Sequence, residues 1–278
     1  MDFNGKVAIV TGASSGIGWE TALEFARRSA VVVGVARREE RLGDLMEKCA
    51  ELSPASSYIA GDLGERGFAE GVIARTVERH GRLDILVNNA GMPIHRHIYE
   101  VSTDDFERVM RVNFLSCMWA TMAAIPHMLM REEAYIVNVS SFATRVAPPR
   151  ETAYTASKAA MDGFTEGLWS DLAGSNIHAA LIWPGPIDTE IWGKDDSPNA
   201  YAGTRHPPKM VADAVVEAIE KKRYQLTAPS LSPQLLSARF LRLFLPSLLR
   251  AGMAWMEPVE PEVVEKARRE ARERLAGG

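Results

Sequence analysis

The sequence predicts an α/β fold, a doubly wound parallel sheet of about seven strands with helices on both faces. The first observation is a rhythm in which short apolar runs alternate with longer amphipathic stretches over residues 6–227. Such alternation is typical of parallel strands joined by crossover helices. The second observation is a glycine-rich turn directly after the first apolar run, where such folds pass from the first strand into the first helix.

Six apolar runs have the length and composition of buried parallel strands, and we expect a seventh strand near Tyr224–Thr227. The six are Lys6–Thr11, Ala30–Val35, Ser57–Ala60, Leu83–Asn88, Tyr135–Val139 and His178–Trp183. The amphipathic stretches between them predict helices that turn one apolar side toward the sheet. These stretches are Gly16–Arg28, Glu39–Leu52, Glu65–His80, Ser102–Met130 and Thr152–Ala173.

The domain prediction places residues 1–228 in one nucleotide-binding and catalytic domain, because no Pro/Gly-rich linker and no internal repeat divides them. Residues 229–278 are expected to form a helical extension packed on or beside that domain, with a charged helix near Glu262–Leu275. The chain of 278 residues is 46% hydrophobic and 24% charged, which is ordinary for a globular protein with a sizeable core. Its net charge of −4 gives no general attraction to nucleic acid or to an anionic membrane.

Cysteine usage and the N-terminal sequence favour a cytoplasmic location. Cys49 and Cys117 are the only cysteines, and they have neither metal-ligand spacing nor the pattern of a disulfide framework. We expect no metal site. The N-terminal residues show no signal-peptide pattern, and no uncharged apolar stretch reaches the roughly eighteen residues of a membrane-spanning helix.

The glycine-rich turn contains Gly12, Gly16 and Gly18, spaced Gly-x-x-x-Gly-x-Gly. Glycines permit a tight turn and let backbone N–H groups approach a pyrophosphate at the positive end of the following helix. The spacing differs from the common Gly-x-Gly-x-x-Gly dinucleotide fingerprint, and a plain glycine-rich turn is the alternative. With Ser14, Ser15 and Ile17 between the glycines, the turn predicts a Rossmann-type nucleotide cradle.

Tyr154 and Lys158 are spaced i and i+4 and would share one face of the helix over Thr152–Ala173. A phenol with a pKa of about 10 is a weak base at neutral pH. A nearby cation favours the phenolate and lowers that pKa. Tyr154 is therefore a candidate general acid/base for a carbonyl or secondary alcohol, although a surface Tyr–Lys pair has the same spacing.

Four motifs, in order along residues 5–227, together resemble the pattern of the short-chain dehydrogenase/reductase family. They are the turn beginning Thr11-Gly12, the run Asn88-Asn89-Ala90-Gly91, Ser141 placed thirteen residues before Tyr154, and Pro184-Gly185 after the sixth strand. The resemblance implies an oxidoreductase that transfers a hydride between a nicotinamide cofactor and a carbonyl or secondary alcohol. It also implies a homodimer or homotetramer in which the two longest helices pair across a two-fold axis.

The resemblance assigns roles to three further catalytic candidates. Ser141 would hydrogen-bond the substrate oxygen and stabilise charge there, while the adjacent Ser140 would be bonded to backbone. Asn113 would disturb its helix and hold a water that links Lys158 to solvent, or else be a buried amide satisfied by backbone. Lys158 would also bond the nicotinamide ribose.

The same resemblance places other residues beside the cofactor. Asn88, Ala90 and Gly91 would lie by the adenosine ribose, in a motif that also supports the central sheet, and Asp62 and Leu63 would lie by the adenine ring. Asp62 is also a candidate turn or N-cap residue. The loop after the sixth strand would bind the nicotinamide carboxamide through Pro184, Gly185, Ile187 and Thr189.

The end of the second strand points to NADP rather than NAD. A carboxylate at this place normally binds the ribose 2′-hydroxyl of NAD, whereas arginine accommodates the 2′-phosphate of NADP. This chain has Arg37 and Arg38 directly after Ala36, and guanidinium groups match phosphate geometry. The alternatives are that both arginines are a solvated helix start, or that Glu39 reaches back to the ribose.

The residues around the catalytic candidates predict an apolar substrate pocket. We expect it to be lined by Phe142, Ala143, Thr144, Arg145, Ile191 and Trp192. The alternative functions are a catalytically idle nucleotide-binding protein and a membrane-peripheral protein of the same fold.

In the extension, Arg239, Arg242 and Arg250 fall within an arc of roughly 80° on a helical wheel, and Pro246 interrupts the pattern. A basic amphipathic helix can lie on a membrane surface. A lid over the pocket or a contact between subunits explains the same pattern, and we expect one of these instead.

Overall fold

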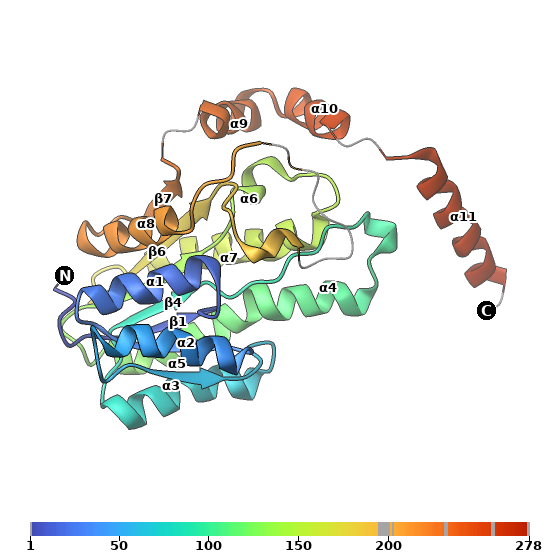
Figure 1. The fold of residues 1–278 in the computed structure, drawn as a ribbon. Coiled ribbons are helices and arrows are strands. Elements are labelled where there is room, and N and C mark those ends of the chain that lie inside the picture. The colour runs from blue at the N-terminus through green and yellow to red at the C-terminus, as the bar shows by residue number, and fades with distance from the viewer. Residues whose placement is uncertain (1, 194–200, 202, 231–232, 257–258, 277–278) are drawn as a thin grey trace.

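The seven strands form one parallel sheet in the computed structural model, which describes residues 2–193, 201, 203–230, 233–256 and 259–276. Figure 1 shows the sheet at the centre with helices on both sides, which confirms the predicted doubly wound fold. The strands are β1 (Val7–Thr11), β2 (Val31–Ala36), β3 (Ser57–Ala60), β4 (Ile85–Asn88), β5 (Ala134–Val139), β6 (Ile177–Pro184) and β7 (Gln225–Ala228).

The strand order is β3-β2-β1-β4-β5-β6-β7. From β1 the chain first builds outward through β2 and β3, and it then returns to place β4 on the other side of β1. Val10 consequently pairs with Gly34 of β2 and with Val87 of β4. In doubly wound sheets a crevice opens at the carboxyl ends of the strands where the order reverses, and here that point lies between β1 and β4.

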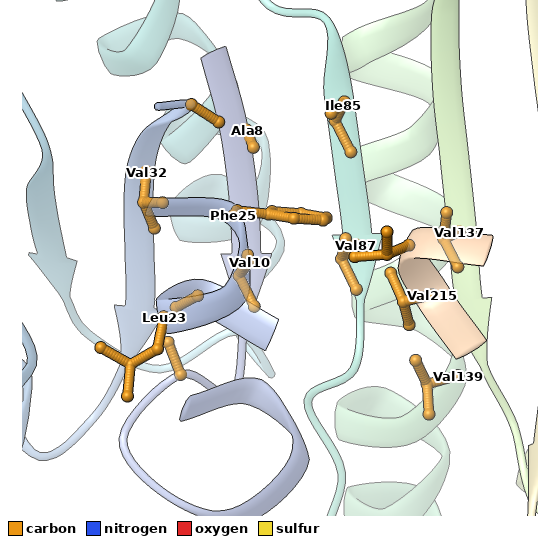
Figure 2. Packing of buried hydrophobic residues seen from close by; sticks show 14 of the residues in the cluster. Ala8, Val10, Leu23, Phe25, Val32, Ile85, Val87, Val137, Val139 and Val215 are labelled. Carbon is orange, nitrogen blue, oxygen red and sulfur yellow. The ribbon is translucent and has the colours of Figure 1, made fainter. Parts of the chain in front are cut away.

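Two layers of helices bury the sheet. On one face α1 (Gly16–Arg27), α2 (Glu39–Ala50) and α8 (Lys209–Glu220) pack on the strands. Figure 2 shows Phe25 of α1 against β1 and β4, and Val215 of α8 beside Val87 and Val137. The prediction missed α8, which lies between β6 and β7.

The opposite face is covered by α3 (Arg66–His80), α5 (Ser116–Met128) and α7 (Thr152–Asp171). The predicted long helix over Ser102–Met130 is divided. α4 (Thr103–Met110) passes into a wide π-helical turn, η2 (Arg111–Leu115), and then into α5. The short helices η1 (Ile98–Glu100), α6 (Ala143–Val146) and η3 (Glu190–Gly193) follow strand ends, and the sequence pattern did not indicate them.

The extension contains α9 (Pro233–Phe244), α10 (Pro246–Met256) and α11 (Pro261–Ala276). Pro246 starts a new helix because proline lacks the N–H that a continuous helix needs. Figure 1 shows α9 and α10 above α6, whereas α11, the predicted charged helix, runs away from the sheet. No helix among the residues that the structure describes is long and apolar enough to cross a membrane.

Candidate active site

A cavity of about 1740 Å³ opens at the carboxyl ends of the strands. Its walls contain eighteen of the twenty-one residues that the sequence predicted for the site. These are Gly12, Ser14, Ser15, Gly16, Ile17, Arg37, Arg38, Asp62, Leu63, Ala90, Gly91, Ser141, Tyr154, Lys158, Pro184, Gly185, Ile187 and Thr189. The other three, Gly18, Asn88 and Asn113, do not line the cavity.

The turn between β1 and α1 is shaped for a close approach to the cavity. Gly12 and Gly16 have φ values of +69° and +56°, which glycine adopts without the cost that other residues pay. Gly18 packs against the turn itself, since a Cβ there would collide with the Gly12 carbonyl oxygen. The sequence placed Gly18 against the cofactor, but its role is to let α1 approach β1.

Thr11 and Asn89 hold the ends of β1 and β4 together. The Thr11 hydroxyl accepts hydrogen bonds from the backbone N–H groups of Asn89 and Ala90, at 2.8 and 3.0 Å. It donates to the Val87 carbonyl oxygen, and Asn89 Nδ2 donates to the Thr11 carbonyl oxygen at 2.9 Å. These bonds fix the floor of the cavity.

Asn88 was predicted to contact the cofactor, but its side chain points away from the cavity. Its Nδ2 donates to Asn138 Oδ1 at 2.9 Å and to Thr121 Oγ1 at 3.2 Å in a buried polar network. Strand side chains alternate between the two faces, so Asn88 points under α5 and supports the sheet.

Tyr154, in the first turn of α7, meets Ser141 after β5. Burial raises the pKa of the Tyr154 phenol to about 12, a hydrogen bond with Ser141 lowers it in part, and the Glu151 carboxylate raises it. The sequence predicted instead that Lys158 would depress this pKa. The pKa of Tyr154 is not lowered in the protein alone, because the effect of burial outweighs that of the hydrogen bond with Ser141.

Lys158 is one turn further along α7 and is also buried. Its Nζ donates to the Val139 carbonyl oxygen at 2.8 Å, so the ammonium group is held against the end of β5. Burial lowers the pKa of Lys158 to about 8, opposed by Cys117 and Asp162.

The two adjacent serines have different partners. Ser140 Oγ donates to the Lys158 carbonyl oxygen at 3.3 Å, which is the backbone role that the sequence allowed for it. Ser141 Oγ accepts from the Ala143 N–H at 3.1 Å and is the serine that meets Tyr154. Only Ser141 therefore combines a place on the cavity wall with a bond to the phenol.

Asn113 lies at the centre of the π-helical turn η2 and is fully buried. Its Oδ1 accepts from the Met92 N–H at 2.8 Å, and its Nδ2 donates to the Met92 carbonyl oxygen and to Ser157 Oγ. Ser157 in turn donates to the Tyr154 carbonyl oxygen. The predicted disturbance of the helix is present, and the amide bonds the Met92 backbone and the Ser157 hydroxyl; the water link from Asn113 to Lys158 stays a prediction.

The end of β2 presents arginine to the cavity. Arg38 donates to Ser14 Oγ and to the Ser14 carbonyl oxygen, all at 3.2 Å, and its Nη1 lies 2.7 Å from Glu190 Oε2. Arg37 is exposed at the same rim. Glu39 accepts instead from the Tyr58 hydroxyl at 3.3 Å and does not line this cavity.

Asp62 has the turn role that the sequence allowed, and its contact with the adenine ring stays a prediction. Its Oδ1 accepts from the Gly64 N–H at 2.9 Å, which makes a local turn. The residue nevertheless lines the cavity together with Leu63.

The substrate side of the cavity differs in part from the prediction. Phe142, Ala143, Ile191 and Trp192 line it as expected, but Thr144 and Arg145 do not. Thr144 Oγ1 donates back to the Ser141 carbonyl oxygen, an ordinary helix-start bond. The Arg145 guanidinium stacks 3.9 Å from the Trp183 ring centroid and pairs with Asp162 at 3.3 Å, outside the cavity.

The cavity wall contains a second set of residues that the sequence did not indicate. They are Ile94, His95, Val146, Glu151, Leu235, Ala238, Met253 and Trp255. Glu151, three residues before Tyr154, could have been found from its position. Leu235, Ala238, Met253 and Trp255 carried no local signal, because the docking of α9 and α10 brings them to the cavity.

The comparisons with known proteins agree with this geometry. A sequence model described as short chain dehydrogenase matches residues 6–200. A "Dehydrogenase/reductase SDR family protein 7-like" from Anopheles gambiae is 33% identical over 261 residues, which cover 88% of this chain and 81% of that protein. The chain belongs to the short-chain dehydrogenase/reductase family.

Two solved structures show the same fold. A family member from Burkholderia phymatum in complex with NAD has a TM-score of 0.81 and 25% identity, covering 94% of this chain and 99% of that chain. A short chain dehydrogenase from Burkholderia cenocepacia in complex with NADP has a TM-score of 0.75 and 29% identity, covering 82% and 97%. The neighbours thus bind nicotinamide cofactors of both kinds.

The glycine turn fits such a dinucleotide. A Cβ at Gly12 would lie 3.0 Å from the Ala90 Cα, and one at Gly16 would lie 2.9 Å from Thr189 Cγ2. Ser15, the N-cap of α1, makes no side-chain bond to the helix, and no acidic residue lies in the first turn. The N–H groups there are placed for an anionic ligand at the positive helix end.

Proposed function

We propose that the protein is an NADP(H)-dependent oxidoreductase that interconverts a carbonyl and a secondary alcohol on an apolar substrate. The observation that carries the proposal is the convergence of Ser141, Tyr154 and Lys158 on one cavity wall. This wall lies between the glycine turn and the apolar residues of α6, η3 and α9. The cofactor, when bound, supplies or accepts the hydride, and the protein manages the proton.

In carbonyl reduction the Tyr154 phenol would give its proton to the carbonyl oxygen, while the Ser141 hydroxyl would donate a hydrogen bond to the same oxygen. The phenol is protonated at neutral pH, as this role requires, because its ordinary pKa of about 10 and the value of about 12 that burial gives it both lie above neutrality. In alcohol oxidation the phenol must lose its proton, and a positive charge close to it would favour that loss. Lys158, with its pKa lowered to about 8, can restore or remove the proton.

The preference for NADP rests on the rim at the end of β2. Arg38 and Arg37 offer guanidinium groups, while Glu39, the carboxylate that could have favoured NAD, is turned toward Tyr58. Glu190 pairs with Arg38 at 2.7 Å. We infer that a 2′-phosphate competes with Glu190 for Arg38, because phosphate carries more charge than a carboxylate and accepts guanidinium bonds in the same geometry.

A panel of ketones and alcohols, each tried with NADP(H) and NAD(H) and read by the absorbance of the reduced nicotinamide, tests the proposal. We expect turnover of an apolar carbonyl or alcohol, with a higher kcat/KM for the NADP pair. Tight cofactor binding with no turnover across chain lengths and ring systems would support the rival reading, an idle nucleotide-binding protein.

A homo-oligomer remains our expectation. Met122 on α5 is 58% exposed, and apolar side chains on a long helix are commonly covered by a partner subunit. Sedimentation velocity at micromolar concentration should give a species larger than the 30.6 kDa chain. A single species of chain mass would refute this.

A further inference from the structure

The outward side of α9 and α10 is an exposed apolar surface, which we call the outer tail face. Its members are large apolar side chains with between 50% and 73% of their surface exposed. They are Leu236, Phe240, Leu243, Phe244 and Leu248. Monomeric soluble proteins rarely expose a large contiguous patch of apolar side chains, and where such a patch is exposed it often marks an interaction site.

Docking of α9 on the body does not account for this surface. The inward side of α9 already packs, because Leu235 and Ala238 contact the cluster of Phe142 and Trp183. Arg242 Nη1 donates to the Thr144 carbonyl oxygen at 2.6 Å on the same inward side. The outer residues on α9 follow the i, i+4, i+7, i+8 spacing of a second helix face, so α9 is apolar on two sides.

The charges on this segment indicate its partner. Residues 229–256 contain three arginines, namely Arg239, Arg242 and Arg250, and no aspartate, glutamate or lysine, although the whole chain has a net charge of −4. Arg239 and Arg250 are exposed on the two helices. Apolar side chains bordered by arginine, without acidic residues, suit a bilayer surface with anionic headgroups.

The outer tail face also continues to the mouth of the cavity. Met253 and Trp255 of α10 line the cavity, and Trp255 is 82% exposed. Tryptophan is typical of the membrane–water interface, because its ring can contact the apolar side while its N–H group stays hydrated. α10 therefore joins the exposed apolar side chains to the substrate side of the cavity.

We propose that the outer tail face docks the protein on the surface of an anionic lipid bilayer, with α9 and α10 lying in the plane of the interface. A second copy of the chain fits this face less well, because a two-fold contact would bring arginines of the same sign together without a carboxylate to pair them. The docking does not depend on turnover. If the proposed function also holds, an apolar substrate would reach the cavity directly from the lipid.

Flotation of the full chain with vesicles tests the docking. We expect the protein to float with phosphatidylcholine vesicles that contain phosphatidylserine, and to do so more weakly with phosphatidylcholine alone. The double change Leu243→Glu, Phe244→Glu should lower the bound fraction about tenfold or more, because it places two carboxylates on the side of α9 that would enter the bilayer. Leu52→Glu, an exposed apolar residue after α2, is the matched control and should float like the wild type.

Two further variants keep the test decisive if the double change impairs folding, which circular dichroism would reveal. Leu248→Glu probes α10 alone and should also reduce flotation. Arg239→Gln with Arg250→Gln should remove the preference for phosphatidylserine while leaving the weaker binding. Failure of the wild type to float with either vesicle would overturn the proposal. So would dissociation of an oligomer by Leu248→Glu in sedimentation, because a second copy would then cover the face.

Discussion

The two walls of the cavity are built in different ways. The predicted cofactor wall comes mainly from segments that follow β1, β2, β3 and β4, and most of its lining residues belong to the sequence motifs. The substrate wall comes from the loop after β4, from α6 and η3, and from α9 and α10. It contains most of the residues that the sequence did not indicate.

The difference has a topological reason. The carboxyl ends of parallel strands meet at one edge of the sheet, so the residues that directly follow β1, β2 and β3 reach the cavity. α9 reaches the substrate wall through contacts such as Leu235 on Phe142 and Arg242 on Thr144. A change in those contacts can therefore alter the substrate side while the cofactor side stays constant.

The largest expected effect is at Tyr154, where the two walls meet. Tyr154→Phe removes only the hydroxyl that moves the proton, and we expect turnover to fall by about 10³-fold or more. NADPH affinity, measured by fluorescence titration, should change little. Activity within tenfold of the wild type would contradict the role of Tyr154.

Ser141→Ala should reduce kcat by about 10²-fold, the effect of losing one donor to a developing oxyanion. Ser140→Ala is the matched control and should be milder, because Ser140 bonds the Lys158 carbonyl oxygen. Steady-state kinetics of both variants would rank them, and the reverse order would assign the role to Ser140.

The cofactor wall alone should respond to Arg37→Ala with Arg38→Ala. Loss of charge-assisted bonds to the 2′-phosphate should weaken NADPH binding by about 10²-fold, while NADH affinity and the KM of the substrate change little. Adding Ala36→Asp should reverse the preference, since a carboxylate repels the phosphate. Tighter NADH than NADPH binding by the wild type would mean that this rim does not select NADP.

The substrate wall alone should respond to Leu235→Ala. Removing apolar carbons from the wall should raise the KM of an apolar substrate about tenfold. The Kd of NADPH should change less than this KM, because Leu235 lies outside the glycine turn, although it reaches the predicted cofactor loop at Gly185. A matching loss of NADPH affinity would show that the two walls are not independent.

The smallest effect is on stability in alkali. Burial lowers the pKa of Lys158 from 10.5 to about 8, so between these values the unfolded chain holds a proton that the folded chain has released. The free energy of unfolding contributed by this group should therefore rise with pH. Lys158→Met should flatten that rise in urea titrations from pH 8 toward pH 10. An unchanged slope would mean that Lys158 is not desolvated in the folded protein.

The sequence by itself determined the sheet, the glycine turn and the shared helix face of the catalytic candidates. Apolar periodicity located all seven strands to within about two residues, and the spacing of Tyr154 and Lys158 placed both on one face of α7. These features are local, since a strand, a turn or a helix face needs only neighbouring residues to specify it.

Only the tertiary structure decided what depended on distant contacts. Asn88 points into the buried polar network under α5, and Arg145 pairs with Asp162 and does not line the substrate cavity. The predicted long helix is divided by the π-helical turn that contains Asn113. The tertiary structure also raised the pKa of Tyr154, which spacing alone suggested would fall. In each case the outcome depends on burial and on partners remote in the chain, and packing alone fixes both.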